Sequence, residues 1–339
     1  MRAARLEKVG SIKTVSIPDP VAGPEEIVVG VEAAGMCGTD RHILKGEYPA
    51  RPPVTLGHEL EGRVRSVGPD TSLRVGTRVT VDPNISCGYC RYCRLGLVAH
   101  CDLLSAIGVD RDGGFASYVV VPERQAYQLP ASVPIGHGAL CEPLACCLRA
   151  LDHAMVRPGC SVAVFGGGVI GQLLVQLARL GGATTIVLST RQEKRRALAE
   201  SFGATATIDP AASDAADIIA GPGGVAPGGV DVVFEAAGVA ETFQQALRSA
   251  RRAGRVVVVG VAPKGLTVPI NPFDLFAREL RIQGSYLNPL THGRAAELVS
   301  SGCLELGPLI TRTVSLDEVP GVLDGPPLSG DTKTVMVPQ

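Results

Sequence analysis

Four cysteines stand close together in the first third of the chain and could bind a metal ion. They are Cys87, Cys90, Cys93 and Cys101, in the pattern C-x2-C-x2-C-x7-C. In a reducing compartment, thiols clustered in this way are more often metal ligands than disulfide partners. Four thiolates complete the tetrahedral shell of a zinc ion and leave no open position for a substrate, so we expect a structural zinc site.

Two alternatives to this structural zinc use the same segment. His100 stands beside Cys101 and could compete with it as a ligand, although four cysteines already suffice. A zinc ribbon that binds nucleic acid would need more positive charge than Arg91 and Arg94 supply.

A second group of zinc-ligand types lies upstream of the cysteine cluster. Cys37 is followed by Thr39 and His42, and His58 and Glu59 stand next to each other further along. Thiolate, imidazole and carboxylate all bind zinc, but a lone Cys or His is more often an ordinary core residue. The residue types therefore permit a second metal site without establishing it.

A glycine-rich motif near the middle of the chain predicts a dinucleotide site. The apolar run Val162–Phe165 leads into Gly166-Gly167-Gly168-Val169-Ile170-Gly171, and a helical pattern follows. In such a strand–turn–helix, Gly166 permits the tight turn, Gly168 lets the backbone approach a pyrophosphate, and Gly171 lets helix and strand pack closely. Val169 and Ile170 are the first residues of the expected helix. The N–H groups at this start of the helix then face the phosphates. A purely structural glycine turn is the less favoured alternative.

The end of the next expected strand bears on which dinucleotide binds. An NAD site usually places Asp or Glu about 20 residues after the motif, where it holds the ribose 2′-hydroxyl. Here the corresponding positions are Ser189 and Thr190, and Arg191 follows at once. Small hydroxyl side chains beside Arg191, with Arg195 nearby, leave room and charge for a 2′-phosphate, so we expect NADP(H) rather than NAD(H). The alternative is that these arginines belong to a solvated helix face.

The elements that must position these residues change in type along the chain. Residues 1–130 favour short strands separated by Gly and Pro, and the pattern turns helical around residues 140–151. From residue 161 onward strands and helices alternate, which is typical of βαβ units and a parallel sheet. The expected strands are 162–165, 185–188, 205–208, 230–235, 255–261 and 282–285, with a β-like tail at 334–337. The expected helices are 169–180, 192–202, 240–253 and 293–301, and 221–229 is expected to be a surface loop.

Composition narrows the classes of function. The 339 residues carry 32 basic and 33 acidic side chains, so the chain has no basic footprint for nucleic acid or for an acidic membrane. Aromatic residues make up 4% and Trp is absent, which argues against stacking on single-stranded nucleic acid. No run reaches the ~18 apolar residues of a membrane span, and the N-terminus lacks the apolar core of a signal peptide. We therefore expect a cytoplasmic protein.

In chain order, these motifs resemble the zinc-dependent medium-chain alcohol dehydrogenases, and most closely their polyol (sorbitol-type) and threonine dehydrogenase branch. The resemblance covers the whole chain. Besides the four cysteines and Gly166–Gly171, the matching segments are Cys37-Gly-Thr-Asp-x-His42, Gly57-His-Glu-x-x-Gly62, Gly76-x-Arg-Val79, Asp112-Gly-Gly-Phe-Ala-x-Tyr118, Glu142-Pro-Leu144 and Asp231-Val-Val-Phe-Glu-Ala-Ala-Gly238.

The resemblance implies an α/β fold in two domains. Residues 1–147 and 288–339 would form a GroES-like, β-rich catalytic domain with a structural zinc lobe at about 86–102. Residues 148–287 would form a Rossmann domain with a doubly wound parallel sheet that binds NADP(H). The substrate would bind in the cleft between the domains. The family also implies a homodimer or homotetramer joined through the cofactor domains.

By the same resemblance, Cys37 and His58 ligate a catalytic zinc, and Glu59 ligates it or lies beside it. Glu142 stands where this branch carries a glutamate that ligates the metal or holds its bound water. Three nearby cysteines could replace Glu142 as a ligand, although we favour small buried apolar side chains for them. These are Cys141, Cys146 and Cys147. One catalytic and one structural zinc ion per subunit are therefore expected.

The family also implies roles for residues that bind no metal. Thr39 and His42 occupy positions that relay the alcohol proton through the cofactor ribose to solvent, and a surface histidine is the alternative for His42. Val259, Val261 and Ser285 match contacts to the nicotinamide, with ordinary strand core as the alternative. The histidines that match no motif are expected to be structural: His137, His153 and His292.

The expected function is hydride transfer between NADP(H) and a secondary alcohol of polyol, cyclitol or amino-polyol type. The polar run Asp110, Arg111 and Asp112 near the expected substrate loop would suit a hydroxyl-rich substrate, or would form an exposed turn. The alternatives are a simple alcohol or threonine dehydrogenase that uses NAD(H), and a non-catalytic cofactor-binding protein of the same fold. A zinc-free enone reductase of this fold would lack Cys37, His58 and the cysteine cluster. The Thr39 and His42 pair argues against a non-catalytic protein.

Overall fold

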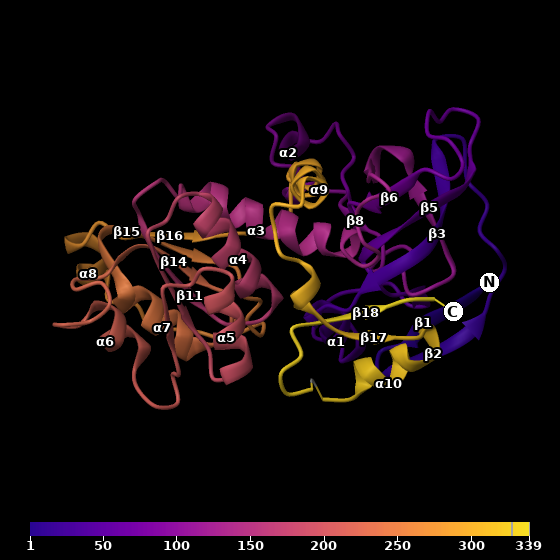
Figure 1. The fold of residues 1–339 in the computed structure, drawn as a ribbon. Coiled ribbons are helices and arrows are strands. Elements are labelled where there is room, and N and C mark those ends of the chain that lie inside the picture. The colour runs from indigo at the N-terminus through magenta and orange to yellow at the C-terminus, as the bar shows by residue number, and fades with distance from the viewer. Residues whose placement is uncertain (327, 339) are drawn as a thin grey trace. The chain divides into compact units, whose positions relative to one another are not determined.

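A computed structural model describes residues 1–326 and 328–338, and the chain divides into two compact units (Figure 1). Unit 1 comprises Met1–Ala145 and Asn288–Gln339, and unit 2 comprises Cys146–Leu287. Among the described residues, no helix is long and apolar enough to cross a membrane.

Unit 1 is built around a mostly antiparallel sheet whose central strand is β3 (Glu26–Gly35). This strand is apolar on both faces and pairs with β5 (Glu59–Val67), β9 (Tyr118–Pro122) and β18 (Lys333–Met336). β18 in turn runs parallel to β17 (Ile310–Val314). The remaining strands are β1 (Arg2–Lys8), β2 (Ser11–Ser16), β4 (Val54–Thr55), β6 (Arg78–Val81), β7 (Asn84–Ile85), β8 (Ser105–Ala106) and β10 (Ala126–Gln128).

Two short helices of unit 1 carry or adjoin residues of the candidate sites. α1 (Gly38–Leu44) begins directly after β3, and α2 (Arg91–Arg94) lies within the cysteine-rich segment. α9 (His292–Ser301) ends at Gly302, whose φ of 69° closes the helix in the left-handed region. α10 (Val319–Asp324) follows β17, and α3 (Cys141–Ala154) begins in unit 1 and ends in unit 2.

Unit 2 is a six-stranded sheet in which all neighbouring strands run parallel. Its strand order is β13-β12-β11-β14-β15-β16. The strands are β11 (Ser161–Phe165), β12 (Thr185–Ser189), β13 (Ala206–Ile208), β14 (Val230–Glu235), β15 (Ala250–Val258) and β16 (Arg281–Gly284). The chain order reverses between β11 and β14, and ligands of such doubly wound sheets bind at the carboxyl ends of the strands beside that reversal.

Helices cover the parallel sheet of unit 2. α4 (Val169–Leu180) packs on β11 and β12, and α7 (Ala240–Ser249) packs on β11, β14 and β15. The other helices are α5 (Glu193–Ser201), α6 (Ala215–Ala220) and α8 (Pro272–Ala277). The central strands are apolar on both faces, as in β11, where four of five residues are buried, and β14, where five of six are, whereas the edge strand β16 is mostly exposed.

The structure corrects one expected boundary between helix and strand in unit 2 and adds two short helices. The helix expected over 240–253 ends at Ser249, because Ala250 is extended and Ala253 has a φ of 58°, so the strand begins at Ala250. α6 and α8 are additional short helices. Each begins with a side-chain cap that the apolar pattern did not reveal: Asp214 accepts hydrogen bonds from two N–H groups at the start of α6, and Asn271 does so at α8.

Candidate functional site

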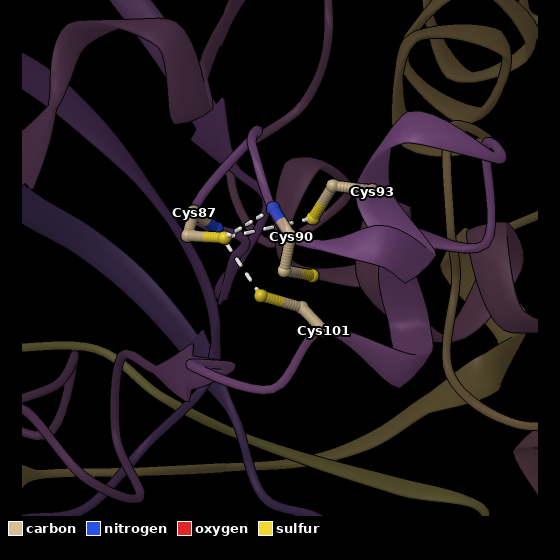
Figure 2. A group of neighbouring side chains, drawn as sticks. All are labelled: Cys87, Cys90, Cys93 and Cys101. Carbon is tan, nitrogen blue, oxygen red and sulfur yellow. Dashed lines mark hydrogen bonds between the residues drawn. The ribbon is translucent and has the colours of Figure 1, made fainter.

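The four clustered cysteines of unit 1 turn their sulfur atoms toward a common centre (Figure 2). The sulfur atoms of Cys87, Cys90, Cys93 and Cys101 all lie within 4.8 Å of one another. Cys87 and Cys93 are separated by 3.9 Å between sulfurs, well beyond the ~2.05 Å of a disulfide bond. All four are free cysteines, and their arrangement is that of a closed four-sulfur metal site.

Backbone N–H groups of the segment point at these sulfurs and favour the thiolate form. The N–H of Cys90 donates to the Cys87 sulfur, and the N–H groups of Cys87 and Leu103 donate to the Cys101 sulfur, each at 3.3 Å. N–H groups of Cys93 and Asp102 lower the pKa of Cys90 to about 7. Burial raises the pKa of Cys93 to about 11, so thiolate, the form that binds metal, is favoured at Cys90 but not at Cys93.

A second set of metal-ligand types comes together at the end of β3 and the start of β5. One ligand atom each of Cys37, His58 and Glu59 lies within 4.8 Å of the others. The register of the two strands places Gly35 opposite Glu59, and a Cβ at Gly35 would collide with the Glu59 carboxylate. The glycine therefore makes room for a carboxylate in the interior of unit 1.

Asp40 organises this site from two sides. One carboxylate oxygen accepts the backbone N–H of Cys37 at 2.9 Å, which caps α1 and fixes the cysteine at its first turn. The other lies 3.3 Å from Nδ1 of His58, leaving Nε2 as the ring nitrogen for a ligand. Burial opposes protonation of His58, but Asp40 and Cys37 outweigh it and hold the pKa of His58 well above its ordinary value.

Lys333 on β18 is a member of this site that the sequence did not indicate. Its ammonium forms an ion pair with Glu59 and donates a hydrogen bond to the carbonyl of Met36 at 3.0 Å. Burial opposes the charged ammonium, but the negative charges of Glu59, Cys37 and Glu142 raise the pKa of Lys333. Asp40 was likewise missed as a positioning residue, although its place three residues after Cys37 fits a helix capping box.

Glu142 lies near Cys37, His58 and Glu59 but is not one of the three residues whose ligand atoms lie within 4.8 Å of one another. It is buried in the first turn of α3, and its charge acts on Lys333. Among the neighbouring cysteines, burial raises the pKa of Cys141 to about 12, and the Cys147 sulfur donates to the carbonyl of Ile170 at 3.6 Å. Cys141 and Cys147 are buried, whereas Cys146 is half-buried, so the interpretation as small buried side chains fits the first two.

Thr39 and His42 lie on α1, just beyond Cys37. The Thr39 hydroxyl lies 3.6 Å from the Cys37 sulfur. His42 is half-buried, and its Nδ1 lies 2.6 Å from the carboxylate of the exposed Glu47. Glu47 therefore fixes the orientation of the imidazole and links it to the surface of unit 1.

The glycine motif of unit 2 forms a tight turn between β11 and α4. Gly166 has a φ of 110° and donates its N–H to the carbonyl of Ser189 at 2.9 Å. A Cβ at Gly171 would overlap the carbonyl oxygen of Gly166, so only glycine allows α4 this close to the strand. Gly168 is the residue before α4, and a Cβ there would meet nothing within 4 Å. The space next to Val169 and Ile170, the first two residues of α4, is therefore free of other protein atoms.

The residues expected to choose between the two dinucleotides gather at the end of β12. Ser189 and Thr190 are buried, and Thr190 packs against Gly167 of the glycine turn. Arg191 is exposed. Arg195 lies in the first turn of α5, and its backbone carbonyl accepts a hydrogen bond from the side chain of Gln172 at 2.8 Å. Arg196 is occupied, because it pairs with Asp209 at 3.1 Å and donates to the Thr190 carbonyl.

The remaining residues that are expected to contact the cofactor lie beyond the ends of β15 and β16. Val259 follows the last residue of β15, Val261 is exposed, and the N–H of Ser285 donates to the carbonyl of Val258 at 2.9 Å. The strands end one or more residues earlier than expected, so all three belong to loops rather than to strand core. Beside them, the buried carboxylate of Glu235 accepts N–H groups of Ala237 and Gly238 and thereby shapes the loop after β14.

The polar run after β8 makes structural contacts. Asp112 accepts the N–H of Thr55 at 2.7 Å and pairs with Arg5 at 3.0 Å, and Arg111 pairs with Glu26 at 2.9 Å. Asp110 accepts the N–H of Ala106 at 3.0 Å. These contacts favour the turn interpretation over a role in binding substrate, because each side chain already holds the loop in place.

The histidines expected to be structural differ in their surroundings. His292 is fully buried in unit 1, where burial lowers its pKa to about 3 and Nε2 lies 3.2 Å from the Thr80 hydroxyl. Burial also lowers the pKa of His137 and of His153. None of the three belongs to either metal-ligand group of the described chain.

Comparison with known proteins gives these two units a family. Residues 23–131 match the alcohol dehydrogenase GroES-like domain, and residues 169–301 match the zinc-binding dehydrogenase domain. The L-threonine 3-dehydrogenase of Pyrococcus horikoshii is 35% identical over 310 residues, covering 88% of this chain and 86% of that protein. The sorbitol dehydrogenase of Bacillus subtilis is 30% identical over 330 residues, covering 96% and 93%.

A solved structure extends the similarity to the whole fold. The NADP-bound structure of a candidate zinc-binding dehydrogenase from Sinorhizobium meliloti 1021 superposes with a TM-score of 0.97 at 54% identity and covers 99% of both chains. Unit 1 is accordingly GroES-like, unit 2 is a Rossmann unit, and the chain is an oxidoreductase. The protein belongs to the zinc-dependent medium-chain alcohol dehydrogenase family, in its polyol and threonine dehydrogenase branch.

Proposed function

We propose that the protein reversibly transfers a hydride between NADP(H) and a secondary alcohol of polyol, cyclitol or amino-polyol type. The observation that carries this proposal is the convergence of Cys37, His58 and Glu59, with one ligand atom from each lying within 4.8 Å of the others. Sulfur, nitrogen and oxygen donors fit a zinc ion that keeps a position for substrate, whereas the four-cysteine cluster fits a closed structural site.

The catalytic zinc would be held by Cys37 and His58, with Glu59 and Glu142 as the carboxylates beside it. When bound, zinc supplies a Lewis acid that favours the ionised form of an alcohol near neutral pH. Asp40 orients His58 through Nδ1, and Lys333 holds the Glu59 carboxylate in place. The second zinc would be held by Cys87, Cys90, Cys93 and Cys101 and would fix the fold of their loop.

Proton transfer would be the task of α1. The Thr39 hydroxyl lies beside the Cys37 sulfur and would accept the alcohol proton. His42 would pass this proton to solvent, since an imidazole can both accept and donate a proton and Glu47 holds its Nδ1 at 2.6 Å. Val259, Val261 and Ser285 would contact the nicotinamide end of the cofactor. When bound, the nicotinamide would supply the acceptor for the hydride.

The preference for NADP(H) rests on the end of β12. The buried Ser189 and Thr190 offer no carboxylate that would repel a 2′-phosphate, and the exposed Arg191 offers a guanidinium that would bind it. Gly166, Gly168 and Gly171, with the first N–H groups of α4, would receive the pyrophosphate. The NADP in the similar Sinorhizobium meliloti structure supports this preference.

Metal analysis tests the catalytic assignment. We expect two zinc ions per chain in the wild type and about one in Cys37→Ser, with oxidation of the alcohol substrate lost. Cys303→Ser is the matched control, because Cys303 is exposed and lies in neither metal group. A Cys37→Ser variant that keeps full activity would overturn the proposed role of Cys37.

Cofactor kinetics test the proposed 2′-phosphate site. The wild type should show a higher kcat/KM with NADPH than with NADH, and Arg191→Asp should reverse that order by weakening NADPH specifically. Lys194→Asp serves as the control, because this exposed lysine lies one turn further along and bears the same change of charge. A clear preference of the wild type for NADH would refute the reading of Arg191. A screen of polyols, cyclitols, amino-polyols and simple secondary alcohols with NADP would define the substrate.

We further infer a homo-oligomer joined through unit 2. In the described chain, β16 pairs with β15 along one edge and offers its other edge to a partner, and the exposed Phe273 and Phe276 lie on the preceding helix α8. An unpaired strand edge beside apolar side chains suits a second copy of the same strand. Light scattering should give the mass of a dimer or tetramer, and Phe276→Glu should shift it toward the monomer.

A further inference from the structure

Gln172 is a glutamine of α4 whose side chain is shielded from solvent. It stands directly after Gly171, in the first turn of the helix, and is 0% exposed. Its side-chain amide donates two hydrogen bonds, one to the carbonyl of Gly167 at 3.2 Å and one to the carbonyl of Arg195 at 2.8 Å. Gly167 belongs to the glycine turn and Arg195 to the first turn of α5, so this one side chain joins the two segments.

This arrangement of Gln172 is unfavourable for stability in one respect. The two N–H donors of its amide are used, but the amide oxygen Oε1 is buried and accepts no hydrogen bond from any described residue. A buried acceptor without a partner lowers the stability of the fold, and an apolar side chain of similar size would avoid that loss. The packing of α4 alone therefore does not account for a glutamine at this position.

The segments that Gln172 joins border the proposed site for the cofactor 2′-phosphate. A Cβ at Gly167 would come within 2.9 Å of three atoms of the Thr190 side chain, so the glycine turn packs directly on the end of β12. Arg191 follows Thr190 in the chain, and Arg195 lies in α5, which packs against α4 (Figure 1). The spacing between the glycine turn and α5 therefore bears on where the two arginines lie.

Arg196 provides a second anchor for the start of α5. It forms an ion pair with Asp209 at 3.1 Å and donates a hydrogen bond to the carbonyl of Thr190 at 2.7 Å. Neighbouring residues of a helix are turned by about 100° around its axis, so Arg195 and Arg196 lie on different faces of α5. One anchor would leave α5 free to pivot about Arg196, whereas the hydrogen bond from Gln172 to Arg195 fixes the helix on a second face.

We propose that Gln172 is a positioning residue for cofactor selectivity. By holding the first turn of α5 to the glycine turn, it keeps Arg191 and Arg195 where their guanidinium groups bind the 2′-phosphate of NADP(H). A guanidinium binds phosphate through two parallel hydrogen bonds, and this geometry is sensitive to small displacements of the helix. The inference rests on the proposed function, in which this phosphate binds beside Arg191.

The contacts that NADP(H) and NAD(H) share depend less on Gln172. The glycine turn, which would receive the pyrophosphate of either cofactor, is also held by the N–H of Gly166, which donates to the carbonyl of Ser189 at 2.9 Å. The close packing of Gly171 on the carbonyl oxygen of Gly166 fixes the turn further. Loss of the Gln172 amide should therefore affect chiefly the phosphate that NADP(H) alone carries.

Fluorescence titration of the full-length, zinc-loaded protein with NADPH and with NADH tests the proposal without a substrate. Gln172→Met keeps most of the length of the side chain and removes both hydrogen bonds. It should raise the dissociation constant of NADPH about fivefold or more and change that of NADH less than about twofold. Gln176→Met is the matched control, because Gln176 is a buried glutamine one turn further along α4, and it should bind both cofactors as the wild type does.

Gln172→Asn keeps the proposal testable if Gln172→Met does not fold. Asparagine retains the amide but is one carbon shorter, so it cannot reach both carbonyls, and NADPH should again be weakened more than NADH. The proposal is overturned if the folded variants keep the wild-type ratio of the two dissociation constants, including the case in which both cofactors are weakened equally. A wild type that binds NADH more tightly than NADPH would refute the proposed cofactor choice and, with it, this inference.

Discussion

Replacing Lys333 by methionine keeps most of the length of the side chain but removes the ammonium that faces Glu59 inside unit 1. The side chains of the pair are 2% and 1% exposed, so water cannot replace the lost partner. Removing one member of a buried ion pair typically costs about 3–5 kcal/mol, because the other charge stays buried and uncompensated. The Met36 carbonyl also loses its hydrogen bond from Lys333 at 3.0 Å. We therefore expect Lys333→Met to lower the free energy of unfolding at pH 7 by about 3–5 kcal/mol.

Urea unfolding followed by circular dichroism measures this loss, first on protein freed of zinc by a chelator and then on zinc-loaded protein. The loss should be smaller with zinc, because a metal ion beside Glu59 would supply the missing positive charge. Lys264→Met is the control, since Lys264 is exposed and such surface substitutions usually stay within about 0.5 kcal/mol.

A double variant separates the ion pair from simple loss of packing. Lys333→Met combined with Glu59→Gln removes both charges of this pair and should recover a large part of the stability lost in Lys333→Met. The reasoning is refuted if Lys333→Met alone lowers the free energy of unfolding by less than about 1 kcal/mol. It is also refuted if the double variant loses as much stability as Lys333→Met and Glu59→Gln lose together as single variants.

Three further changes test other parts of the molecule. Burial raises the pKa of Asp82 from 3.8 to about 6, so between these pH values the folded chain retains a proton that the unfolded chain releases. The free energy of unfolding should therefore fall by up to about 3 kcal/mol as the pH rises from about 4 to 6. Asp82→Asn should flatten this fall in urea unfolding across that range; an unchanged slope would contradict the assignment. Gly171→Ala should displace the glycine turn and lower the melting temperature. Gly168→Ala places its Cβ where no other atom lies within 4 Å, so it should keep the wild-type melting temperature and weaken NADP binding only. Equal melting temperatures of the two variants would contradict this interpretation. Cys90→Ser should lose one zinc ion and make the loop around residues 86–102 sensitive to proteolysis, and resistance equal to that of wild type would argue against a structural zinc.

The sequence was informative wherever the chemistry is local. The four cysteines lie within one short segment, so the loop that carries them also brings their sulfurs together. The glycine motif and the apolar pattern after it predicted a helix over 169–180, and α4 confirms it at Val169–Leu180. Each of these features depends on residues close together in the chain, whose types and spacing already restrict the backbone.

The tertiary structure decided the features that join distant segments. Lys333 reaches Glu59 because β18 and β5 flank β3 on opposite sides, and Asp40 reaches His58 because α1 begins where β3 ends beside the start of β5. It also placed Arg255 beside Arg281 through the register of β15 and β16. Strand pairing and register bring these charges together, and neither follows from the local spacing of the residues. The sequence could therefore name the candidate metal ligands, while the partners that orient and neutralise them appeared only in the folded chain.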